Sequence, residues 1–232
     1  MPDIIDKMRI LILNCDMDKS KRTNGTAVIS RLLRKRYRNL KIDVYNSFEN
    51  KAPSSKELKL YDHAVITGSR ASVYEDEKWI RNMKKFITEI DRMKIPTLGI
   101  CFGFQIVAEA FGGKVIQGDQ FIEGFKGIKI TGRNTPLFNG IKANDKFYES
   151  HKDILKKKPK GAKTIAKQET RTEAYILRNF YCLQFHPEIL PEVATVMAER
   201  DGKKTDRILG GVSRDYDAPA KIIYNFMDSK SE

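Results

Sequence analysis

The stretch LGICFGFQIVAEAFGG, residues 98–113, joins a short apolar run to an apolar helix and places a cysteine at the joint. Its segment Gly99-Ile-Cys101-Phe-Gly103 has the pattern of a nucleophile elbow, a strained strand-to-helix turn with glycine on either side of the nucleophile. Such a turn presents the sulfur at the carboxyl end of a strand, where the start of the next helix favours the thiolate. The stretch predicts a reactive Cys101, although glycines also flank strand-helix joints for packing alone.

The residues before this stretch alternate between strand and helix patterns. Apolar or alternating runs predict strands over 8–15, 41–46, 63–68 and 96–101. Apolar spacing of three and four residues predicts helices that start after the N-cap Asn24 and that cover 75–93 and 102–111. The alternation predicts an α/β fold with a central, mostly parallel sheet of the flavodoxin-like or Rossmann-like kind and helices on both faces.

After Gly113 the pattern changes to short segments of strand type separated by glycine, asparagine and lysine-proline breaks. These segments are KVIQG, GIKI, KFYES, KTIAK, AYIL and YCLQF. They predict an additional small antiparallel strand region. Helices are expected again over 191–200, which begins with a proline at a favoured first position, and over 218–227. With no internal repeat and no long linker, we expect a single domain over residues 1–232.

The composition is that of a folded globular protein, with 41% hydrophobic and 9% aromatic residues. No segment approaches the roughly 20 apolar residues that span a membrane, and the start MPDIIDKMRILIL does not have a signal-peptide pattern. Cys15, Cys101 and Cys182 are far apart and form no CxxC pair, which argues against disulfides and a zinc site. We therefore expect a cytoplasmic protein with no membrane partner, metal or cofactor; Walker and dinucleotide fingerprints are missing as well.

The net charge of +13 comes from 43 Lys and Arg against 30 Asp and Glu, and it is partly clustered in 31–41 and 152–167. Such clusters can attract nucleic acid or an acidic partner. Neither cluster carries a nucleic-acid motif or interleaved stacking aromatics. A solvated, lysine-rich surface is the preferred interpretation, and nucleic acid is an unlikely partner.

A base for Cys101 is found in YCLQFHPEIL (181–190), where an apolar strand ends and His186 and Glu188 follow. A histidine just past a strand end, with a carboxylate two residues on, can supply both the base and the group that orients it. A single histidine is more often structural. Its position, the nearby acid and the elbow together predict the catalytic set Cys101, His186 and Glu188.

The motifs CFGFQ (101–105) and QFHPE (184–188) together resemble the class I glutamine amidotransferases, which carry a glycine-flanked C-x-G-x-Q and a later H-P-E. The segments 66–80 and ESHKD (149–153) are similar to the family's post-strand loop and its serine-histidine-x-aspartate loop. This chain departs from the common pattern at Gly68-Ser69-Arg70, where many members have Gly-Gly-Pro, and at Phe104. The changed loop resembles the GMP synthase-like branch, which also contains γ-glutamyl peptidases.

The resemblance implies that Cys101 attacks the side-chain amide of glutamine, that His186 moves the protons and that Glu188 holds His186. The same resemblance implies backbone donors for the oxyanion and side chains for the substrate. These are Phe102, Gly68 and Ser69 for the oxyanion, and Gln105, Ser150 and His151 for glutamine or a γ-glutamyl substrate.

Three functions remain open from the sequence. The chain is a glutaminase that passes ammonia to a separate ATP-dependent synthetase, or a hydrolase of γ-glutamyl peptides or conjugates, or a non-catalytic basic binding protein on the same fold. The segment GGVSRD (210–215) superficially resembles the phosphate loop of ATP-pyrophosphatase domains. It lacks the required spacing, and we expect a simple loop before the last helix.

Overall fold

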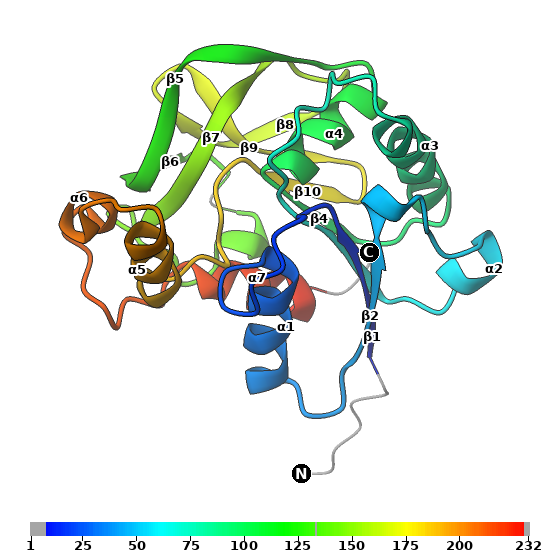
Figure 1. The fold of residues 1–232 in the computed structure, drawn as a ribbon. Coiled ribbons are helices and arrows are strands. Elements are labelled where there is room, and N and C mark those ends of the chain that lie inside the picture. Colours follow the sequence, from blue (N-terminus) through cyan, green and yellow to red (C-terminus); the bar gives the residue numbers. More distant parts are fainter. Residues whose placement is uncertain (1–7, 133, 230–232) are drawn as a thin grey trace.

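The computed structural model describes residues 8–132 and 134–229 (Figure 1). Residues 1–7, part of the segment considered above for a signal peptide, lie outside the described residues. The helices are α1 (Gly25–Arg36), α2 (Ser55–Leu58), α3 (Lys78–Arg92), α4 (Phe102–Ala110), α5 (Pro191–Arg200), α6 (Thr205–Leu209) and α7 (Ala220–Asp228). The strands are β1 (Arg9–Asn14), β2 (Lys41–Asn46), β3 (His63–Ile66), β4 (Thr97–Ile100), β5 (Lys114–Gly127), β6 (Lys129–Ile130), β7 (Lys146–Lys157), β8 (Lys163–Gln168), β9 (Arg171–Leu177) and β10 (Phe180–Leu183).

The main sheet has the strand order β2-β1-β3-β4-β10-β9-β8-β6. The strands from β2 to β10 pair in parallel, whereas β9, β8 and β6 continue the sheet in antiparallel pairings. A separate two-stranded antiparallel sheet consists of β5 and β7. The predicted α/β fold with a mostly parallel central sheet and a small antiparallel region is confirmed.

Helices cover both faces of the main sheet (Figure 1). Successive side chains of β1 pack alternately against the helices on the two faces. Ile10 and Ile12 lie in one buried cluster with the apolar faces of α1 and α7. Leu11 and Leu13 lie in a second buried cluster with α3 and α4. A parallel strand buried on both faces needs apolar residues at successive positions, and RILILN supplies them.

Local signals in the sequence position the first helices. Asn24 caps α1, because its side chain accepts a hydrogen bond from the N–H of Ala27 at 3.1 Å. Close packing explains why the elbow has glycines at positions 99 and 103. A Cβ at Gly103 would lie 2.4 Å from the carbonyl oxygen of Ile66, and a Cβ at Gly99 would lie 2.8 Å from the carbonyl carbon of Gly103. Only glycine allows α4 to approach β3 this closely.

The second half of the chain differs in extent from the sequence-based expectation. The strand expected over 146–150 continues to Lys157 as β7, so part of the basic cluster 152–167 belongs to a strand. The segment expected over 114–118 extends to Gly127 as β5. Lysine side chains on an exposed strand end keep the charge in water, which hides the strand from a pattern based on apolar alternation. Helix α5 has the predicted bounds, with its proline in the first turn.

Within the described residues, no helix is both long enough and apolar enough to cross a membrane.

Candidate active site

The site lies where the parallel strands end. Cys101 follows β4, Gly68 follows β3 by two residues, and His186 follows β10 by three. In open parallel sheets the carboxyl ends of the strands form the usual crevice for ligands. Three segments that are far apart in the sequence therefore meet at the carboxyl end of the sheet.

Cys101 has the strained backbone of a nucleophile elbow. Its φ is 52° and its ψ is −99°, a conformation that non-glycine residues rarely adopt. The turn is fixed from two sides, because the N–H of Cys101 donates to the carbonyl of Leu183 at 2.7 Å and its own carbonyl accepts from Gln105 at 3.1 Å. The motif predicts a sulfur that is presented openly at the end of the strand, but the side chain is nearly buried. Cys101 is 5% exposed and lines a cavity at the strand ends.

The other two cysteines do not reach this cavity. Cys15 and Cys182 are fully buried, and burial raises the pKa of each thiol to about 12. A thiol with such a pKa is a poor nucleophile at neutral pH.

His186 is held by Glu188. Nδ1 of His186 lies 2.8 Å from Oε1 of Glu188, and the imidazole and the carboxylate are both nearly buried. Nδ1–H donates to the carboxylate, which leaves Nε2 with a lone pair for proton transfer. Among the described residues Nε2 has no hydrogen-bond partner. The N–H of His186 donates to the carbonyl of Tyr148 at 2.8 Å, which ties the histidine to β7.

Two opposing effects act on the pKa of His186. Burial lowers it, but the charges of Glu188 and of the Cys101 sulfur raise it, and the net effect lies well above the usual value. The imidazolium is therefore the favoured form when the thiolate is present.

The cavity has a volume of about 680 Å³ and lies within the size range of small-molecule sites. All of the side chains predicted to act on the substrate border it, as do Gly68 and Ser69. Phe102 does not, because its ring stacks on Trp79 in the core with centroids 5.3 Å apart. Only the backbone N–H of Phe102, at the first position of α4, is available to the site.

Gly68 lies against both His186 and Cys101. A Cβ at this position would lie 3.0 Å from Cε1 of His186 and 3.7 Å from Cβ of Cys101. The next residue, Ser69, uses its hydroxyl to accept from the N–H of Ala71 at 3.1 Å. The loop that differs from the common Gly-Gly-Pro pattern therefore lies beside His186 and Cys101, whereas Phe104 is buried and packs against Tyr175.

Gln105 is 3% exposed, and its amide nitrogen donates to the carbonyl of Asp153 and to Oε1 of Gln184, both at 3.3 Å. Gln184 in turn directs its own amide nitrogen to the sulfur of Cys101 at 3.7 Å. Gln184 was not among the predicted site residues. The signal that could have found it is its place in QFHPE, two residues before the histidine.

Ser150 and His151 lie on β7, close to Cys101. The sulfur of Cys101 is 4.0 Å from the carbonyl oxygen of Ser150. His151 borders the cavity, but both ring nitrogens are engaged within the protein: Nδ1 with the carbonyl of Asp153 and Nε2 with Glu149, each at 3.0 Å.

A second group of titratable side chains lies behind this strand. Glu173 is buried beside Glu149 and His151. Burial, together with the charge of Glu149, raises the pKa of Glu173 to about 7 against the opposing effects of His151 and Arg171.

The far wall of the cavity was not expected from the sequence. It includes Phe121 and Glu123 of β5 and, from α5 and beyond, Arg200 and Lys203. At the edge of the cavity, the guanidinium of Arg200 donates a hydrogen bond to the carboxylate of Asp18 over 3.1 Å. No motif marks these residues, because the tertiary packing of the two-stranded sheet and α5 brings them together.

Comparison with known proteins agrees with this geometry. Residues 23–201 match the family model described as glutamine amidotransferase class-I. The chain belongs to this family. The matched range includes the elbow, the H-P-E segment and the intervening β7.

Relatives of this class I glutamine amidotransferase include two kinds of enzyme. It is 32% identical over 153 residues to γ-glutamyl peptidase 4 of Arabidopsis thaliana, covering 63% of this chain and 61% of the peptidase. It is 32% identical over 184 residues to the glutamine-hydrolysing GMP synthase of Helicobacter pylori, covering 77% of this chain and 32% of the synthase. The chain thus spans less than two thirds of the peptidase and about a third of the synthase.

Solved structures support the fold. A glutamine amidotransferase from Thermotoga maritima superposes with a TM-score of 0.79 at 19% identity, covering 96% of this chain and 97% of that one. The glutaminase domain of a Trypanosoma brucei CTPS superposes with a TM-score of 0.61 at 17% identity, covering 85% of this chain and 95% of that one. At these identities the likeness establishes the architecture alone.

Proposed function

We propose that this chain hydrolyses the side-chain amide of glutamine through a γ-glutamyl thioester on Cys101. The observation that carries the proposal is the meeting of a strained cysteine and a carboxylate-held histidine in one cavity at the strand ends. Family membership and the glutamine-hydrolysing GMP synthase relatives support the same chemistry.

In the proposed first step the Cys101 thiolate attacks the amide carbon, and a tetrahedral intermediate forms. His186 donates its Nε2 proton to the amide nitrogen, the carbon–nitrogen bond breaks, and ammonia leaves. In the second step His186 takes a proton from water, the hydroxide attacks the thioester, and the carbon–sulfur bond breaks to release glutamate. Glu188 stabilises the imidazolium in both steps.

The oxyanion of each intermediate would be stabilised by backbone N–H groups. Phe102 offers one because the first N–H groups of a helix have no partner within the helix. The Gly68-Ser69 loop offers the second source, since Gly68 lies beside both catalytic side chains. Gln105, Ser150 and His151 are proposed to contact the substrate. Both ring nitrogens of His151 already have partners within the protein.

The ammonia is proposed to pass to a separate ATP-dependent synthetase, in line with the GMP synthase relatives. A second function is favoured by the size of the cavity, which extends past the triad to Phe121 and Lys203. This extent leaves room for a leaving group larger than ammonia. With the γ-glutamyl peptidase relatives, it supports hydrolysis of γ-glutamyl peptides or conjugates as the alternative.

The test is incubation of the chain with glutamine and, separately, with a γ-glutamyl dipeptide, followed by glutamate measurement and intact mass. We expect glutamate release and a γ-glutamyl adduct on Cys101. Cys101→Ala should abolish both, whereas Cys15→Ala, which alters a buried thiol outside the cavity, should retain both. Turnover retained in Cys101→Ala would overturn the proposal. A higher kcat/KM for the dipeptide than for glutamine would select the alternative.

A further inference from the structure

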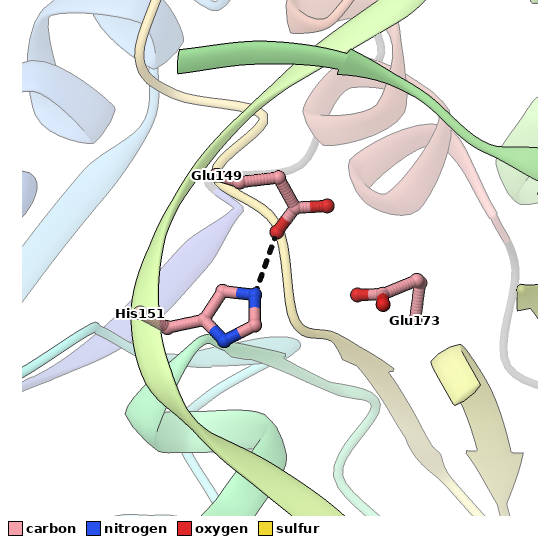
Figure 2. Close-up of side chains that lie close together, drawn as sticks. All are labelled: Glu149, His151 and Glu173. Carbon is pink, nitrogen blue, oxygen red and sulfur yellow. Dashed lines mark hydrogen bonds and ion pairs between the residues drawn. The ribbon is translucent and has the colours of Figure 1, made fainter. Parts of the chain in front are cut away.

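Two glutamates and one histidine lie close together in the space between the two sheets, outside the triad. Glu149 and His151 are two residues apart on β7 and so project from the same face of the strand. Glu173 comes from β9 in the main sheet. Figure 2 shows the carboxylate of Glu173 pointing toward the other two side chains. Their exposures are 0% for Glu149, 5% for His151 and 1% for Glu173.

The hydrogen bonds of His151 leave an unusual contact. A carbonyl oxygen can only accept, so the 3.0 Å contact with Asp153 places the proton of the ring on Nδ1. In the neutral ring, Nε2 then directs a lone pair at Oε2 of Glu149, 3.0 Å away. Two acceptors at this distance require a positive species between them, which is a proton or a metal ion. A backbone carbonyl on the other ring nitrogen is the common second-shell partner of a metal-binding histidine.

The carboxylates also have oxygens that nothing satisfies. Oε1 of Glu149 and Oε2 of Glu173 are buried and have no hydrogen-bond partner among the described residues. Glu173 uses its other oxygen to accept from Nε of Arg171 at 3.2 Å. Buried carboxylate oxygens are costly when they are unpaired, and they are normally bonded or bound to a metal ion. One half-buried arginine cannot balance two buried carboxylates.

We propose that Glu149, His151 and Glu173 bind one divalent cation, with Zn²⁺ as the best match. One ligand atom from each residue lies within 4.8 Å of the other two. Tetrahedral ligands about 2.1 Å from a zinc ion lie about 3.4 Å apart, so a pair of ligand atoms as wide as 4.8 Å would have to close by more than about 1 Å when the ion binds. Imidazole nitrogen and carboxylate oxygen suit zinc, and two carboxylates neutralise its charge. Water would supply the fourth ligand.

The ion would connect two strands that position groups around the nucleophile. Ser150, between the two ligands of β7, has its carbonyl 4.0 Å from the Cys101 sulfur. The carbonyl of Glu173 accepts from the N–H of Gln184, whose side chain contacts the same sulfur. Access is from the cavity, which His151 borders. The inference does not depend on the substrate and replaces the sequence-based expectation that no metal is bound.

The test uses the full chain without a polyhistidine tag, stripped with a chelator and then equilibrated with ZnSO₄. Elemental mass spectrometry after gel filtration should give about one zinc per chain, and zinc should raise the midpoint of thermal unfolding. Absence of retained zinc together with an unchanged midpoint would overturn the proposal. Titration in competition with a chromophoric chelator, on the wild-type chain alone, gives the same decision if the variants below fail to fold.

Two variants and two controls locate the ion. Glu149→Gln and Glu173→Gln keep the size of the side chain and remove a negative ligand, and each should weaken zinc binding at least about tenfold. Glu199→Gln, which changes an exposed carboxylate on α5, should bind as the wild type does. Cys101→Ala should also retain the ion. Loss of zinc in Cys101→Ala, with retention in both glutamine variants, would place the ion at the nucleophile and refute the site.

Discussion

Nδ1 of His186 donates to Oε1 of Glu188 over 2.8 Å, and the second oxygen of Glu188 is buried without a partner among the described residues. The carboxylate is therefore held in place by its contact with the imidazole and by packing. Because Glu188 is 2% exposed, water does not screen its charge. This is the arrangement in which a carboxylate most strongly favours the imidazolium.

Replacement of Glu188 by glutamine should lower kcat for amide hydrolysis by about 10²- to 10⁴-fold, because the histidine loses its charge partner and its fixed tautomer. KM should change little, since Glu188 does not reach the amide. Steady-state glutamate release measures both constants. The matched control is Glu192→Gln on exposed α5, which should have wild-type kinetics. A variant of Glu188 with near wild-type kcat would remove this carboxylate from the mechanism.

Gly68→Ala should impair catalysis without much loss of stability. The added Cβ would meet Cε1 of His186 at 3.0 Å, so the imidazole must shift by some tenths of an ångström. Displacements of about 1 Å in an active site can cost about 10²-fold in rate, and we expect a loss of about tenfold or more. Gly127→Ala is the control, because no atom lies within 4 Å of its added Cβ. Equal kinetics in the two variants would contradict a tight loop beside His186.

Gln184→Leu removes the amide that contacts the Cys101 sulfur while keeping the volume of the side chain. Hydrogen bonds to a charged group contribute about 1.5 to 3 kcal/mol, so the thiolate should be less stabilised. The rate of Cys101 alkylation by iodoacetamide, measured from pH 5 to 9, should rise at a higher pH than in the wild type. Gln120→Leu, the same change at an exposed residue of β5 that does not line the cavity, should leave the alkylation profile unchanged. Coincident profiles for Gln184→Leu and wild type would exclude the contact from thiolate stabilisation.

The first half of the fold could be predicted because its signals are local. The elbow, the N-cap Asn24 and the apolar face of α3 each specify an element within one short window. The pairing of β9 and β8 with the main sheet could not be predicted, since it depends on contacts between residues far apart in the chain. For β7 the sequence predicts the first part, 146–150, but not the extension to Lys157, because lysines at the end of the strand obscure the alternation.

The candidate site likewise combines residues that local motifs predict with residues that only tertiary packing brings in. The residues that belong to motifs line the cavity at the strand ends, as Cys101, His186 and Gln105 do. Arg200 belongs to the cavity through the packing of α5 against the loop after β1, and no sequence pattern marks it. No sequence pattern marks Glu173, because a glutamate in a strand normally faces water. Only the stacking of β7 over β9 reveals that it is buried.

The stability of the fold should depend on His63 at the opposite end of the sheet. This histidine is 6% exposed and packs edge-on against Phe226 of α7, with ring centroids 5.2 Å apart. Burial lowers its pKa from 6.5, against weaker raising effects from the Ser229 backbone, Asp62 and Asp228. The folded chain therefore resists protonation at pH values where the unfolded chain already binds the proton.

It follows that the free energy of unfolding falls as pH decreases from about 6.5 through the lowered pKa, because the unfolded state then binds more protons. Removing the titrating ring should remove its contribution to this fall. Urea unfolding of wild type and His63→Gln at pH 7.5 and 5.0 measures it. The wild type should lose more stability between these pH values than the variant, which lacks the titrating ring. An equal loss in both chains would mean that His63 is protonated as readily in the folded state as in the unfolded state.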